Sequence, residues 1–121
     1  ESGYAAPAGA DPLPALRRHA KRHPLEAPGE SDLTAQVDFA AIEALADALG
    51  LQSHGPVTQG AFLQSLGIAE RAAALAQKNP DRQERLGREL NRLIAPDQMG
   101  ALFKALCLSS PSLPPPAGFP P

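Results

Sequence analysis

The sequence contains very few aromatic side chains and a single cysteine. Trp is absent, Tyr occurs once, and aromatic residues make up 4% of the 121 residues. A hydrophobic core must therefore be built mainly from aliphatic side chains, and a chain of this length buries only a modest one. The lone Cys107 excludes an internal disulfide and a zinc cluster built on several cysteines, which fits a reducing compartment.

No charge of one sign dominates, and no long hydrophobic run is present. The formal net charge is -2, so the chain lacks the global basic field that is typical of nucleic-acid-binding proteins. The longest apolar runs are far shorter than the roughly 20 residues that span a bilayer. No charged-then-apolar start resembles a signal peptide. We expect a cytoplasmic protein with no nucleic-acid partner and no membrane span.

Proline is the abundant residue, and its distribution divides the chain. Fourteen prolines occur, six of them within the last 11 residues. Residues 1–14 are small and proline-rich, which indicates a loop, and the basic run 15–23 is ambiguous between strand and helix. We expect residues 1–110 to form part of one domain and residues 111–121 to be a proline-rich tail, extended or polyproline-like.

Apolar periodicity predicts several helices in the second half of the chain. Asp38 and Thr58 are good N-cap residues, and Gly50 and Gly67 stand where helices commonly end. Asn79 precedes Pro80, a pair that favours the start of a further helix. The expected helices span 39–49, 58–66, 68–78 and 81–94, with apolar faces that include Ile42, Leu45, Leu49, Leu86, Leu90, Leu93 and Ile94.

Two short segments read as strands. Residues 51–57 form one, expected to end at Gly55-Pro56, and residues 102–109 form the other. Two strands separated by helices do not make a stable sheet by themselves. We therefore expect the chain to be the C-terminal portion of a larger α/β protein, helix-rich with a few strands, and not a self-sufficient catalyst.

The histidines and the cysteine do not indicate a metal site. His19 and His23 have the i, i+4 spacing of a zinc-binding pair on a helix. Their neighbours are cationic and no third ligand lies nearby, so we expect no metal there. Cys107 lies in an apolar run and is expected to be an inert thiol.

Two polar segments stand out at predicted helix starts. In the first, Asp32, Thr34 and Asp38 precede a helix, and in the second Gln59 follows the strand at His54–Val57. Ligands of open α/β sheets gather at such strand-to-helix junctions. Helix capping explains the same residues without a ligand, and the residues alone leave both interpretations open.

These segments also carry a resemblance. In order, PGESDLTAQVDF, HGPVTQGAFLQSLGI and APDQMGALFKALCLSSPSLPPPAGF closely resemble the C-terminal part of the MidA-like family of S-adenosylmethionine-dependent methyltransferases. The resemblance extends from about Asp11 to Phe119 and keeps the order and spacing of all three segments. It implies the C-terminal portion of a Rossmann-like class I methyltransferase fold.

The resemblance also implies a function. The family cofactor is S-adenosylmethionine, and its mitochondrial member is understood to methylate an arginine of a complex I subunit. The implied partner is thus a protein with a methyl-accepting arginine, and a homodimer is possible. Carboxylates hold guanidinium groups best, which makes Asp32 and Asp38 substrate-binding candidates with Glu30 weaker. Thr34 and Gln59 belong to the same expected substrate-binding set.

The chain departs from the family pattern in one respect. The glycine-rich cofactor loop and the acidic ribose-binding residue have no counterpart in these 121 residues, so we expect no cofactor-binding residue here. The alanine-, arginine- and proline-rich composition is typical of a high-GC bacterium, which predicts a bacterial cytoplasm. The alternative is a non-catalytic helical module whose apolar helix faces bind a partner protein.

Overall fold

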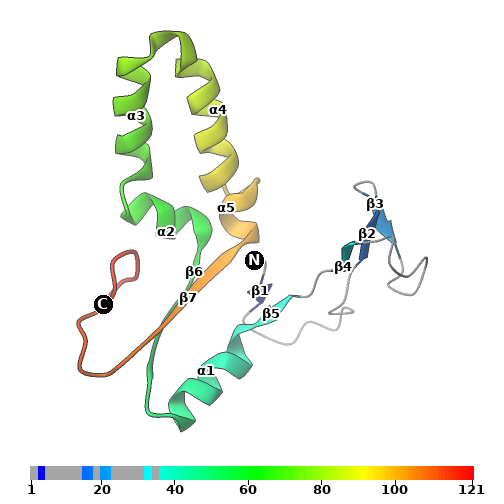
Figure 1. The fold of residues 1–121 in the computed structure, drawn as a ribbon, viewed down its shortest axis with the longest axis vertical. Coiled ribbons are helices and arrows are strands. Elements are labelled where there is room, and N and C mark those ends of the chain that lie inside the picture. The colour runs from blue at the N-terminus through cyan, green and yellow to red at the C-terminus, as the bar shows by residue number, and fades with distance from the viewer. Residues whose placement is uncertain (1–2, 5–14, 18–19, 23–31, 34–35) are drawn as a thin grey trace.

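The computed structural model describes residues 3–4, 15–17, 20–22, 32–33 and 36–121, and it is a helix-rich α/β structure. Figure 1 shows a long two-stranded ribbon with helices at both of its ends. In chain order the elements are β1 (Gly3–Tyr4), β2 (Ala15–Arg17), β3 (Ala20–Arg22), β4 (Asp32–Leu33), β5 (Val37–Asp38), α1 (Phe39–Ala48), β6 (Gln52–Thr58), α2 (Gln59–Ser65), α3 (Ile68–Lys78), the 3-10 helix η1 (Pro80–Arg82), α4 (Gln83–Ile94), α5 (Met99–Leu102) and β7 (Lys104–Ser109).

The first two helices start and stop where the sequence predicts. The Asp38 carboxylate accepts a hydrogen bond from the Ala41 amide at 3.1 Å, and the Thr58 hydroxyl accepts one from the Ala61 amide at 3.2 Å. Both side chains satisfy amides that have no partner within the first helical turn. Gly50 and Gly67 have φ angles of 71° and 87°, a backbone conformation that favours glycine.

The helices α3 and α4 form an antiparallel hairpin that stands out from the ribbon (Figure 1). The bounds of α3 match the prediction, whereas α4 begins two residues later than expected because Pro80–Arg82 form a 3-10 turn. Asn79 occupies the N-cap position of that 3-10 turn and Pro80 opens it, as expected, but the Asn79 side chain makes no capping hydrogen bond there. Its side-chain amide donates to the Leu75 carbonyl at 3.0 Å and so satisfies the C-terminal end of α3 instead.

The ribbon consists of β6 and β7, which pair antiparallel from Gln52 opposite Ser109 to Thr58 opposite Lys104. The prediction that the first strand ends at Gly55-Pro56 was wrong, because β6 continues to Thr58. An irregularity between His54 and Val57 interrupts the register. Proline has no amide hydrogen for the ladder, so a local break in pairing accommodates it within a strand.

The expected strand 102–109 is shorter in the structure. Leu102 ends the short helix α5, and pairing begins only at Lys104. The Ala95 carbonyl accepts hydrogen bonds from the amides of Gln98 and Gly100, both at 3.0 Å. These bonds close a turn that winds the chain into α5 before it extends into β7.

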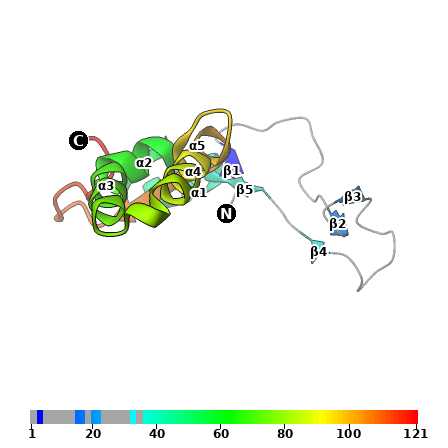
Figure 2. The ribbon, with the colours of Figure 1, turned by 90° about the horizontal axis from the view of Figure 1, so that it is seen from above.

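The described residues among the first 38 lie mainly in short strands. β1 pairs with β5 in parallel, and β2 pairs antiparallel with both β3 and β4. In both views β2, β3 and β4 lie away from the helices (Figure 1 and Figure 2). The ambiguous run 15–23 is thus extended at 15–17 and 20–22. His19 and His23 lie outside the described residues.

The backbone of the proline-rich tail is not extended along its whole length. The Leu113 amide donates to the Ser110 carbonyl at 3.0 Å, and the Phe119 amide donates to the Pro116 carbonyl at 3.3 Å, so turns form at both places. The expectation of an uninterrupted extended tail was therefore wrong. The tail turns back beside α2 (Figure 1).

Very few side chains of the described residues are fully covered. Only Phe39 and Ala46 of α1 count as buried hydrophobic residues there. Leu45 and Leu49, on the same predicted apolar face of α1, are 61% and 67% exposed. One side of that face thus contacts the chain and the other lies open. None of the helices in the described part is long and apolar enough to cross a membrane.

Candidate functional site

The junction between β6 and α2 is held by hydrogen bonds to other elements of the described structure. Gln59 is its central residue: its side-chain amide donates to the Leu93 carbonyl at 2.9 Å, and its backbone amide donates to the Phe103 carbonyl at 2.9 Å. The first bond satisfies one of the last carbonyls of α4, which have no partner within that helix. Gln59 thereby ties the start of α2 to the end of α4 and to the residue before β7.

Glycines allow the helix ends to meet at this junction. A Cβ added at Gly60 would lie 2.5 Å from the Ile94 carbonyl oxygen, and one at Gly100 would overlap the same oxygen. Both glycines are buried. The start of α2, the end of α4 and the start of α5 therefore approach more closely than any side chain allows.

A polar pair lies farther along the ribbon. The His54 Nε2 atom and the Ser109 hydroxyl are 2.9 Å apart, and Cys107 stands opposite His54 in the strand register. Ser53 on the adjacent position has a buried hydroxyl with no hydrogen-bond partner among the described residues. A histidine and a serine alone lack the third, orienting group that nucleophilic catalysis requires, so we assign this pair a structural role.

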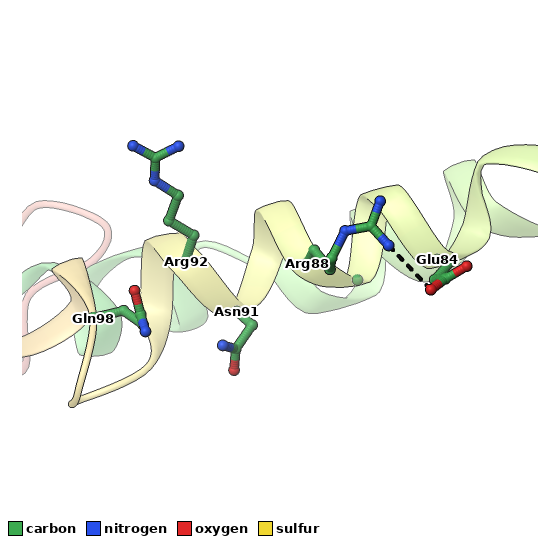
Figure 3. A pocket seen from close by; sticks show the side chains of 6 residues that line it. Glu84, Arg88, Asn91, Arg92 and Gln98 are labelled. Atoms are coloured by element: carbon green, nitrogen blue, oxygen red, sulfur yellow. Dashed lines mark ion pairs between the residues drawn. The ribbon is translucent and has the colours of Figure 1, made fainter.

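A shallow polar pocket lies on the outer side of α4, where Figure 3 shows its lining. Arg92 and Asn91 project in different directions from α4, and Arg88 points toward Glu84, 3.1 Å from it. The pair is highly exposed, at 67% and 90%. On the same helix, the hydrogen bond from Arg85 to Glu89, followed by the charge of that carboxylate, raises the pKa of Arg85. These side chains do not converge on one point and read as a solvated helix face.

Two apolar grooves flank the α3–α4 hairpin. One is lined by Ile68, Leu75 and Leu93 with Arg71 and Glu89 at its rim, and the other mainly by alanines of α3. Leu86 and Leu90 contribute to both grooves. Glu89 is paired with Arg85, and Gly87, which lines the second groove, lies within helix α4, so neither groove combines an acid with a glycine-rich turn.

The four predicted substrate-binding residues have different positions. Asp32 forms part of β4, although its side chain is not described, and Thr34 lies outside the described residues. Asp38 and Gln59 each hydrogen-bond within the fold, Asp38 to the start of α1 and Gln59 to the end of α4. Their role toward a substrate stays a prediction. Capping explains what the structure shows of both.

The fold assigns the chain to a class of protein. A structure from Burkholderia thailandensis described as a "likely methyl transferase", bound to S-adenosyl-homocysteine, superimposes with a TM-score of 0.74 at 27% sequence identity. That superposition covers 88% of this chain and 27% of the other. A second structure from the same organism gives a TM-score of 0.75, also at 27% identity, over 88% of this chain and 28% of the other. The predicted class, a portion of a class I methyltransferase-like fold, is thereby confirmed.

Sequence comparison finds relatives among the methyltransferases. Residues 3–57 match the family described as "Putative S-adenosyl-L-methionine-dependent methyltransferase". The chain is 39% identical over 100 residues to the mitochondrial protein arginine methyltransferase NDUFAF7 homolog of Drosophila melanogaster, and 37% identical to NDUFAF7 of Rattus norvegicus. Each match covers 81% of this chain and 23% of the relative. The predicted resemblance to the MidA-like family of S-adenosylmethionine-dependent methyltransferases is thereby confirmed, and the chain spans about a quarter of the length of these relatives.

Reasoning from the sequence did not foresee the bonds that Gln59 makes. Its place after a predicted strand makes Gln59 a candidate, but that place does not reveal which residues its side chain contacts. Gly60 and Gly100 were not selected as site residues at all. Their spacing to Ile94 is not visible in the sequence, and only the closure of the β6–β7 ribbon brings the three together.

Proposed function

We propose that this chain is the C-terminal segment of an S-adenosylmethionine-dependent protein-arginine methyltransferase linked to the assembly of respiratory complex I, working in a bacterial cytoplasm. The observation that carries the proposal is the match, over 81% of this chain, to a relative named as a protein arginine methyltransferase. The fold shared with a structure bound to S-adenosyl-homocysteine supports the cofactor. The link to complex I assembly comes from the resemblance to the MidA-like family. The Burkholderia thailandensis neighbours support a bacterial setting, whereas the curated relatives are mitochondrial.

The chemistry assigns a task to this segment. Methyl transfer to arginine forms a carbon–nitrogen bond, breaks the carbon–sulfur bond of a methyl sulfonium, and releases a proton from the guanidinium. A carboxylate on the substrate side holds the guanidinium in a bidentate geometry and favours its orientation. Asp32 is our choice for that carboxylate, because the Asp38 carboxylate already accepts from the Ala41 amide.

The test compares aspartate variants in the full-length parent enzyme. We expect Asp32→Asn to lower methyl-transfer efficiency about ten- to a hundredfold, since a charged hydrogen bond contributes roughly 1.5–3 kcal/mol. Cofactor affinity and melting temperature should stay unchanged. Asp38→Ala should cost about 1 kcal/mol of stability through loss of the cap, whereas Asp38→Asn keeps a good capping residue and should behave as the wild type.

Asp47→Ala is the matched control, since Asp47 is an exposed acid on the same helix, α1. It should change neither activity nor melting temperature. If Asp32→Asn leaves the efficiency unchanged, or if activity, cofactor affinity and stability all fall together, the substrate-binding assignment is wrong. In that case the segment before α1 is structural.

The alternative of a non-catalytic helical module has one observation in its favour. The apolar grooves beside Leu86 and Leu90 are open, and no residue of α3 or α4 is buried. A module of that kind folds alone and binds a partner through this hairpin. Methyl transfer by the parent enzyme, together with an unfolded isolated chain, excludes it.

A further inference from the structure

The end of the proline-rich tail packs onto the β6–α2 junction. The ring of Phe119 lies on the ring of Phe62 in α2, with centroids 5.3 Å apart and planes inclined by 48°. Tilted arrangements at this separation are favourable for aromatic pairs. This contact adds to the two hydrogen bonds of Gln59 and the close approach of Gly60, which also hold α2.

Two glycines provide the space for this packing. A Cβ at Gly118, whose φ angle is 89°, would overlap the Phe62 ring and lie 3.4 Å from Leu66. Gly55 of β6 has a φ angle of 96°, and a Cβ there would lie 2.8 Å from the Ala105 carbonyl oxygen and 3.2 Å from the Phe119 ring. The tail backbone thus touches α2, and the Phe119 ring touches the irregular part of β6.

Prolines before Phe119 reduce the conformational entropy that the tail loses when the ring packs. Pro114, Pro115 and Pro116 restrict the backbone immediately before the turn. The Phe119 amide then closes that turn by donating to the Pro116 carbonyl at 3.3 Å. Leu113, on the other side of the prolines, is 57% exposed, so the specific contact begins only after them.

We propose that Phe119 is a positioning residue: through Phe62 and Gly55 it holds α2 against β6 and so fixes the place of Gln59 and the β6–α2 junction. We call the tail, residues 111–121, the strap, because its packing holds that junction in place. Any effect of the strap on substrate binding rests on the proposed function, because it assumes that the junction borders the acceptor site. The effect on local order does not depend on that function.

The test measures amide hydrogen exchange in the full-length parent enzyme. In Phe119→Ala we expect the amides of α2 to exchange about tenfold faster, because local opening of a segment follows the contacts that hold it. The amides of the α3–α4 hairpin should stay unchanged. Phe119→Tyr restores the ring and should restore the wild-type exchange, and Leu113→Ala, the matched tail control, should have no effect.

Kinetics form a second readout. With a peptide that contains a methyl-accepting arginine, Phe119→Ala should raise KM about threefold or more with little change in kcat or in cofactor affinity. The proposal that Phe119 holds α2 is wrong if the α2 amides of Phe119→Ala exchange at the wild-type rate. It is equally wrong if the amides of α3 and α4 are accelerated as much as those of α2, or if Phe119→Tyr does not restore wild-type exchange in α2. If Phe119→Ala speeds exchange in α2 but leaves KM unchanged, the β6–α2 junction does not affect substrate binding. A wild-type enzyme without methyl transfer refutes the proposed function, and the exchange results still decide the strap.

Discussion

Small side chains at a few positions decide how closely the elements of this chain approach. Gly60 and Gly100 face the Ile94 carbonyl, and Gly118 faces the Phe62 ring, at distances that exclude a Cβ. Gly87, by contrast, lies within α4 with nothing within 4 Å of the position that its Cβ would occupy. Close neighbours therefore require glycine at positions 60, 100 and 118, whereas position 87 has room for a side chain.

This difference gives a prediction for paired alanine variants. Gly60→Ala should lower the stability of the parent enzyme by about 1–3 kcal/mol, because the new methyl group forces α2 away from α4. Gly87→Ala should raise it by about 0.5–1 kcal/mol, since alanine loses less backbone entropy in a helix. Melting temperatures by differential scanning calorimetry check both. A stabilising Gly60→Ala variant would show that the helix ends do not meet as described.

At the scale of elements, α4 illustrates which side chains matter for stability. Its exposed face carries the Arg85–Glu89 pair at 2.8 Å, whose side chains are 73% and 54% exposed. Its other face carries Leu90, which is half-buried and lines both grooves of the hairpin. Solvent screens the ion pair, whereas apolar burial is largely independent of salt.

We therefore predict opposite results for two neighbouring substitutions. Leu90→Ala should destabilise the α3–α4 hairpin by about 1–2 kcal/mol through lost apolar contact. Glu89→Gln should leave the melting temperature unchanged at physiological salt. Thermal unfolding followed by circular dichroism measures both. A larger loss for Glu89→Gln than for Leu90→Ala would mean that α4 is held by charge and not by its leucines.

At the scale of the whole molecule, the described structure has more apolar surface than it covers. Leu45, Leu49 and Leu102 are all more than 60% exposed, and the β6–β7 ribbon is a sheet of only two strands. Both features are expected of a segment that packs against further strands and helices. The coverage of about a quarter of the relatives' length agrees with this picture.

The isolated 121-residue chain should therefore bind no S-adenosylmethionine. Isothermal titration calorimetry should detect no heat of binding for this chain, while the proposed full-length parent enzyme, as the positive control, should bind the cofactor. Micromolar affinity of the isolated chain would contradict the expectation. It would also mean that a cofactor site exists in these residues without a glycine-rich turn or a ribose-binding acid.

The sequence by itself determined most helix boundaries and the resemblance to a methyltransferase family. The caps at Asp38 and Thr58, the stops at Gly50 and Gly67, and the bounds of α3 follow from interactions within a few residues, so their signals are local. Helix α4 and its start at Asn79-Pro80 were also predicted, but the 3-10 form of the first turn and the bond from the Asn79 side chain back to α3 were not. The three segments that carry the family resemblance are equally visible without a structure.

Only the tertiary structure decided how these pieces meet. The bonds from Gln59 to Leu93 and Phe103, and the packing of Phe119 on Phe62, join residues that are far apart along the chain, so no periodicity reveals them. The break in pairing that lets β6 continue past Pro56 depends on its partner strand in the same way. Local chemistry specified where helices begin and end, and long-range packing specified which of their residues form the candidate site.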